Sequence, residues 1–154
     1  MDYLIVKWLH ILSSTVLFGT GLGSAYYMFF ASRTRDPRIV ASVVRQVVIA
    51  DWIFTTPTII LQPLTGAWLV HRVGFDWSAW WLTTTIVLYI VAGAAWLPVV
   101  WMQIRMRTMA EEAVRGARPI PDLYYRYLRM WVALGVVAFV ALVAVFYLMV
   151  AKPT

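Results

Sequence analysis

Four long runs of apolar residues, separated by short polar segments, make up most of this sequence. The runs cover roughly residues 3–30, 52–73, 77–106 and 123–151. A helix needs about 20 mostly apolar residues to cross the hydrocarbon core of a bilayer, and each run is that long. A spanning helix also satisfies its backbone polar groups within itself. The pattern predicts an all-α integral membrane bundle of four transmembrane helices, with residues 1–154 in one domain.

The connections between the runs differ in their helix-forming and helix-breaking residues. In the first, Asp36 directly precedes Pro37, a favourable pair for the start of a helix. Residues 38–50 then predict either a helix on the membrane surface or an extension of the second span. The second connection is short, whereas the third, residues 107–122, contains two prolines and is expected to interrupt the helix.

Basic residues are distributed unevenly between the two ends of the predicted spans. Of the 13 lysines and arginines, the majority lie in or beside the first and third connections. The opposite end carries only Lys7, Arg72 and Lys152. The positive-inside rule therefore predicts that residues 31–50 and 105–122 are cytoplasmic and that both termini lie on the other side.

Composition supports a membrane protein and excludes several classes of site. The chain is 62% hydrophobic, well above the 45–50% typical of soluble domains, and its mean hydropathy is +0.76. The net charge of +6 comes from arginines that flank apolar runs, so the expected partner is the lipid bilayer with its anionic headgroups, and no nucleic acid. The chain has no cysteine, which excludes thiolate ligation and covalent haem attachment. The first apolar run is too long for a cleavable signal and is expected to be a span.

His10 is an ionisable residue inside the first apolar run, roughly 10 Å along a helix from the start of that run. An ionisable residue within a span is a functional hypothesis by default. Neutral imidazole is a common axial ligand of haem iron, so His10 is the candidate metal ligand. The alternative is that its side chain only hydrogen-bonds a serine, a carbonyl group or an interfacial water.

Three further polar residues belong to the same end of the predicted bundle. Lys7 lies one turn before His10, and it or Arg72 could neutralise haem propionates. Lys7 could instead extend its ammonium group to the outer surface. His71 is a weaker candidate for a second axial ligand, because it lies closer to water than His10, and a surface histidine is the alternative.

The second span contains polar residues close to prolines. Gln62 precedes Pro63, and a kink at this position would shape a cofactor pocket or be purely structural. Asp51 lies at the cytoplasmic start of the same span. We expect it to serve as a helix N-cap or as an ion-pair partner of Arg126 or Arg129.

Small residues form a ridge along the first span. Gly19 and Gly23 are four residues apart, and Ser14, Gly21 and Ala25 lie close by. Such ridges let helix backbones approach one another closely in lipid. The ridge therefore predicts helix packing, with room for a flat macrocycle as the alternative.

Short motifs along the chain suggest a family. They are Lys7-x-Leu9-His10-Ile11, Thr56-Pro57-x-x-Ile60-Leu61, Gly66-x-Trp68-Leu69 and Lys152-Pro153. Together with Arg45 and the four-helix layout they resemble the HemJ-type protoporphyrinogen oxidases. In that family the histidine corresponding to His10 is understood to be a haem b ligand. The resemblance implies haem b at His10 and, if the protein is an enzyme, a HemJ-like oxidoreductase.

Other stretches depart from that family. The segment 77–83 lacks the histidine and lysine that HemJ-type proteins carry early in the third helix, which argues against protoporphyrinogen oxidation. The segments 17–23 and 62–66 look more like a sister group. It is an uncharacterised bacterial family of predicted integral membrane proteins, distantly similar to HemJ and to the membrane domain of CopD-type copper proteins. This likeness implies a bacterial inner (cell) membrane, and the positive-inside rule then predicts that both termini are periplasmic.

Three functional hypotheses follow. The first is a haem b-binding membrane protein with a redox or electron-transfer role, acting as a homo-oligomer or with a membrane redox partner. The second is a cofactor-free membrane subunit or assembly factor that acts through helix–helix packing. The third is copper handling, in which thioethers would bind Cu(I). The methionines available for it are scattered near the cytoplasmic ends: Met28, Met102, Met106 and Met109.

Overall fold

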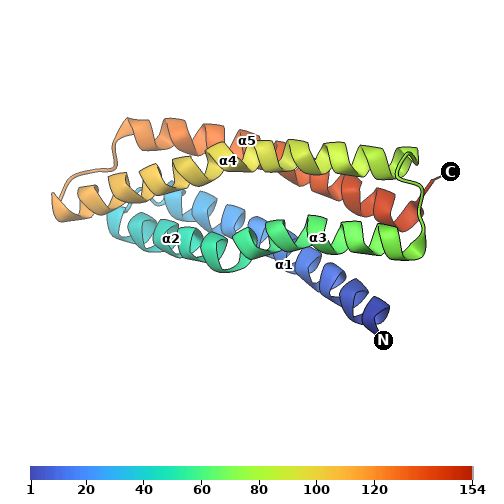
Figure 1. Ribbon diagram of the computed structural model, residues 1–154. Helices are drawn as coiled ribbons and strands as arrows, with labels where there is room; N and C mark the ends of the chain where they lie inside the picture. The colour runs from blue at the N-terminus through green and yellow to red at the C-terminus, as the bar shows by residue number, and fades with distance from the viewer. Residues whose placement is uncertain (154) are drawn as a thin grey trace.

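The structure is a computed structural model that describes residues 1–153, and over this range it is all-helical (Figure 1). Its elements are α1 (Asp2–Arg33), α2 (Pro37–Ala50), the π-helical turn η1 (Asp51–Thr55), α3 (Thr56–Val73), α4 (Trp80–Arg115) and α5 (Asp122–Ala151). Within the described residues, four helical segments are long and apolar enough to cross a membrane: α1, the continuous segment Pro37–Val73, α4 and α5. The predicted fold class is confirmed.

The helices form two antiparallel pairs (Figure 1). α1 packs mainly on α2 and α3, α4 packs along α5, and the two pairs meet chiefly where α2 contacts α4. Both termini and the connection 74–79 lie at one end of the bundle, which we call the terminal end. The connections 34–36 and 116–121 lie at the other, which we call the arginine-rich end.

α2 is an extension of the second span. The Asp36 side chain accepts a hydrogen bond from the backbone N–H of Arg38 at 2.8 Å, and Pro37 occupies the first turn, as predicted. The helix then runs through η1 into α3 without a break, so the alternative of a separate surface helix is wrong. The physical reason is that Val40 and Val44 are buried in the bundle while Arg38 points outward.

α4 is shifted and longer than predicted. It begins at Trp80 and continues to Arg115, so the expected end near residue 106 is wrong, and the helix break is confined to residues 116–121. The helix continues because small side chains at Ala110 and Ala113 are buried against the bundle. The polar residues between them lie on the other faces of the helix.

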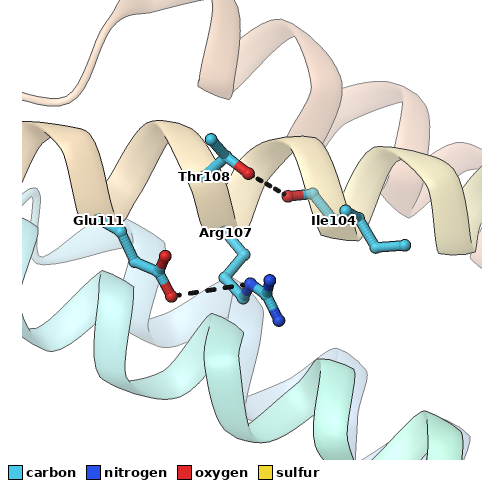
Figure 2. Close-up of polar contacts among 4 residues, drawn as sticks. All are labelled: Ile104, Arg107, Thr108 and Glu111. Carbon is cyan, nitrogen blue, oxygen red and sulfur yellow. Dashed lines mark hydrogen bonds and ion pairs between the residues drawn. The ribbon is translucent and has the colours of Figure 1, made fainter.

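Figure 2 shows how the polar side chains of this extension interact within the helix. Arg107 Nε lies 3.6 Å from Glu111 Oε1, one turn later, and Thr108 Oγ1 donates a hydrogen bond to the Ile104 carbonyl at 3.1 Å. Helix ion pairs of this type contribute about 0.3–0.5 kcal/mol. They support the helix locally, whereas burial of its small residues fixes its position.

The freed carbonyl at Pro63 is satisfied from a neighbouring helix. Proline has no N–H to donate to the carbonyl four residues earlier, which here belongs to Ile59. The Tyr89 hydroxyl of α4 donates to that carbonyl at 2.7 Å. Earlier in the same span, Thr58 Oγ1 donates to the Phe54 carbonyl at 2.7 Å. These bonds keep the helix intact at a depth where water is scarce.

The tightly packed core lies in the arginine-rich half of the bundle. Near the terminal end, a smaller cluster contains Val70, Trp81, Leu82 and Leu148. Water drives apolar side chains together, but lipid does not, so dense packing is expected where helices extend out of the bilayer. The main core comprises Met28, Val40, Val44, Val47, Val99, Met102, Met106, Ala110, Ala113, Ile120, Tyr124, Leu128 and Trp131.

Candidate functional site

His10 lies between α1 and α3 within a small polar cluster. Its Nδ1 is 2.7 Å from Thr65 Oγ1. The Gln62 amide donates to the His10 carbonyl at 2.8 Å and also to Ser13 Oγ. Ser13 Oγ in turn donates to the His10 carbonyl at 3.1 Å. We call these four residues the histidine cluster.

A glycine allows α3 to approach the imidazole. A Cβ atom at Gly66 would lie 3.3 Å from His10 Cε1, closer than side chains normally tolerate. Small residues at helix contacts serve this purpose in membranes. The imidazole ring is therefore held against the α3 backbone, with its Nδ1 and Cε1 atoms facing that helix.

The hydrogen bonds of Thr65 bear on which imidazole nitrogen carries the proton. Thr65 Oγ1 donates its single proton to the Leu61 carbonyl at 2.7 Å, a common arrangement for threonine in a helix. When the hydroxyl proton is used in this way, Thr65 Oγ1 accepts from His10 and Nδ1 carries the hydrogen. This assignment leaves a lone pair on Nε2, which forms no hydrogen bond within residues 1–153.

The other residues predicted for the haem site lie apart from the histidine cluster. Lys7 is exposed, with Nζ 5.7 Å from the centre of the Tyr3 ring. Arg72 and His71 are exposed in the last turn of α3. Of the predicted set, the structure brings together His10 and Gln62, and Gln62 is engaged with the His10 backbone.

Multidentate metal binding finds little support in the part of the chain that the structure describes. Residues 1–153 contain no group of three or more histidine, aspartate or glutamate side chains arranged to hold a metal ion. Met28, Met102 and Met106 are buried in the main core, and Met109 packs against it. Their burial among apolar side chains accounts for them without a copper site.

The structure places Asp51 differently from the sequence-based prediction. It lies inside the continuous helix, is only 6% exposed, and accepts a hydrogen bond from Thr55 Oγ1 at 2.8 Å. The buried Gln103 side chain of α4 lies beside the same carboxyl group. Among residues 1–153, neither Arg126 nor Arg129 forms an ion pair with it, so the predicted N-cap and ion-pair roles are both wrong.

A polar stripe connects Asp51 to the histidine cluster. Every member is buried: Asp51, Thr55, Thr58, Gln62 and Thr65. Successive members are four or three residues apart, which places them on one helix face. This spacing was visible in the sequence and could have identified Asp51. At 1.5 Å per residue, Asp51 and Thr65 lie roughly 21 Å apart along the helix.

A cavity of about 470 Å³ lies between α1, η1 and the α4–α5 pair. Most of its wall is apolar, and Asp51, Thr55 and Gln103 contribute to one part of it. His10 is not among the lining residues. Gly21, Gly93 and Gly135 come from three different helices and line the space, and a Cβ atom at each would meet nothing within 4 Å. The lack of side chains at these three positions keeps the cavity open.

The small ridge of α1 does not form the close helix contact that was predicted. A Cβ atom at Gly19 or Gly23 would meet nothing within 4 Å in the described chain. The close approach occurs instead at Gly66, where the His10 side chain lies against the α3 backbone. Gly19 and Gly23 are therefore available to a molecule outside the chain, whereas Gly21 and Ala25 of the ridge line the cavity.

Comparison with known proteins places the chain in a family. The profile of the family described as "Predicted integral membrane protein (DUF2269)" matches residues 4–153, nearly the whole sequence, and the chain belongs to that family. Neither the comparison with curated proteins nor that with solved structures gives a match. Membership of a predicted integral membrane family is thus confirmed, and the family description assigns no activity.

Proposed function

We propose that this membrane protein binds haem b through His10 Nε2 and serves a redox or electron-transfer role. One observation carries the proposal: Thr65 Oγ1 lies 2.7 Å from His10 Nδ1, while Nε2 has no hydrogen-bond partner among residues 1–153. Histidines that bind metals commonly donate their other N–H to a fixed oxygen, which sets the tautomer and the orientation of the ring. Thr65 has that geometry here.

The remaining parts of the proposed site come from the same end of the bundle. Lys7 lies one turn before His10 with its ammonium group exposed, and Arg72 is exposed at the end of α3. Both can neutralise propionates at the membrane surface. His71 follows Thr65 by six residues and therefore lies roughly 9 Å further along the helix. Because Thr65 marks the depth of His10, His71 is not at that depth, and the proposed site uses one histidine of this chain. Bound haem would supply one-electron exchange.

The resemblance of Lys7–Ile11 to the first helix of HemJ-type proteins supports the same ligand. The positive-inside rule supports a bacterial inner membrane orientation with the arginine-rich end in the cytoplasm and both termini in the periplasm. His10 would then lie toward the periplasmic side. The absence of HemJ-like polar residues in segment 77–83 favours electron transfer over protoporphyrinogen oxidation.

An absorption spectrum of the purified protein tests the proposal. Protein from haem-replete cells, purified in dodecyl maltoside, is expected to show a Soret band that shifts on reduction with dithionite. A pyridine haemochrome assay is expected to identify haem b at about one per chain, since the chain offers one such ligand. A colourless protein that also fails to bind added haemin would contradict the proposal.

The exposed ridge of α1 favours a second candidate, a membrane subunit that acts through helix packing. Gly19 and Gly23 meet no other part of the described chain, although small residues at this spacing typically support close helix contact in lipid. We propose a second copy of this chain as the partner helix.

Substitutions on the ridge test this second candidate. Gly19→Leu and Gly23→Leu are expected to remove most co-purification of two differently tagged copies from membranes, because leucine prevents the backbones from approaching. Thr20→Leu adds similar bulk on a neighbouring face of α1 and serves as the control. Equal co-purification of all three variants with the unaltered chain would rule out this interface.

A further inference from the structure

The cavity beside η1 contains a buried carboxyl group that has no cationic partner. Asp51 is 6% exposed, and no lysine or arginine of residues 1–153 forms an ion pair with it. Its hydrogen-bonding neighbours are Thr55 and Gln103, both uncharged. Acidic groups at membrane depth are costly and usually face a functional cavity or a counter-ion. No side chain of the described residues therefore acts as the counter-ion of Asp51.

Aromatic rings line the same cavity. Tyr89 and Trp96 come from α4, Trp131 from α5 and Phe18 from α1. The faces of tryptophan and tyrosine rings attract organic cations by about 0.5–2 kcal/mol each, most strongly away from water. The wall therefore combines apolar surface, aromatic side chains and one acidic group, which together suit an apolar body that carries positive charge.

The size of the cavity suits a small organic molecule. Its volume of about 470 Å³ falls within the range of roughly 300–1,000 Å³ that is usual for ligand sites. It is open because Gly21, Gly93 and Gly135 leave free space where side chains would project. A larger side chain at any of these three positions would reduce the volume of the cavity.

We propose that this cavity binds a lipophilic organic cation, with the positive charge near Asp51 and the apolar body against the aromatic wall. A neutral lipid chain would match the apolar wall but would leave the carboxyl group without a partner. The site is separate from the proposed haem site, because His10 does not line the cavity. Failure of either proposal therefore leaves the other standing.

Binding of tetraphenylphosphonium to the purified protein in dodecyl maltoside, measured by equilibrium dialysis, tests the proposal. Asp51→Asn removes the charge but keeps an oxygen that can accept the Thr55 hydrogen bond. It is expected to weaken binding by about 30-fold or more, as when one partner of a buried charge pair is removed. Asp122→Asn, at the exposed start of α5, is the matched control and should leave binding unchanged. Tetraphenylborate, an anion of similar size, is expected not to bind.

Gly135→Leu fills the cavity and is expected to abolish tetraphenylphosphonium binding, whereas Thr20→Leu, outside the cavity, should not. His10→Ala should also retain binding. Thermal unfolding and circular dichroism identify any variant that fails to fold, and Gly93→Leu then replaces Gly135→Leu. Equal affinity of Asp51→Asn and the unaltered chain, or equal binding of tetraphenylborate, would overturn the proposal in favour of a neutral apolar ligand.

Discussion

Replacing His10 by alanine is expected to abolish the Soret band of the purified protein. The proposed site takes one axial ligand from this chain, and alanine offers no lone pair in its place. The loss should be close to complete, and haemin titrated into the purified variant should not restore the spectrum of the unaltered protein. Absorption spectra of oxidised and dithionite-reduced samples at equal protein concentration provide the measurement.

Two matched substitutions separate ligation from general damage. His71→Ala removes an exposed histidine of the same helix pair and should keep the full Soret band. Thr65→Val keeps the shape of the side chain but removes the oxygen that hydrogen-bonds Nδ1, and it is expected to weaken haem affinity by about 10–100-fold. If His10→Ala retained the spectrum while His71→Ala lost it, His10 would not be the ligand.

Replacing Tyr124 by alanine is expected to destabilise the protein by about 3–5 kcal/mol, as for other large-to-small changes in a packed core. Tyr124 is fully buried in the main core. Its hydroxyl lies 2.7 Å from Ser32 Oγ, whose own proton is donated to the Met28 carbonyl at 2.7 Å. Tyr124 therefore donates to Ser32 and ties the start of α5 to the end of α1.

The free energy of unfolding in mixed dodecyl maltoside and SDS micelles measures this effect. Tyr124→Phe removes the hydroxyl alone and is expected to cost about 1 kcal/mol. Tyr147→Ala changes the same residue type at a position that is 68% exposed and should fall within about 0.5 kcal/mol of the unaltered protein. Equal unfolding free energies for Tyr124→Ala and Tyr147→Ala would show that the core is not packed as described.

The sequence was sufficient to identify the four spans, because the length of an apolar run is a local property that lipid imposes directly. It was less informative about helix ends. Residues 38–50 and 107–115 mix charged and apolar positions, which suits either a surface helix or an extended span. Val44 and Ala110 are buried against other helices, which makes both segments extensions of the spans. Those contacts join parts of the chain that are distant in sequence.

The candidate sites show the same division between local and distant information. His10 could be singled out because an ionisable residue in an apolar run is conspicuous. Its partner Thr65 is 55 residues away in the sequence, and that hydrogen bond holds the imidazole ring against α3. Asp51 was assigned to a helix start because η1 continues the helix where the sequence suggested a beginning. The cavity could not be foreseen, since its glycines belong to three helices.

The continuous segment Pro37–Val73 contains 37 residues and α4 contains 36. At 1.5 Å per residue each is about 54–56 Å long, whereas a bilayer with its headgroups is only about 40–45 Å thick. Moderate tilt does not absorb the difference. We expect the excess to emerge at the arginine-rich end, because the arginines and the main core lie there. A water-soluble protein approaching from that side would meet a rigid helical projection rather than flexible loops.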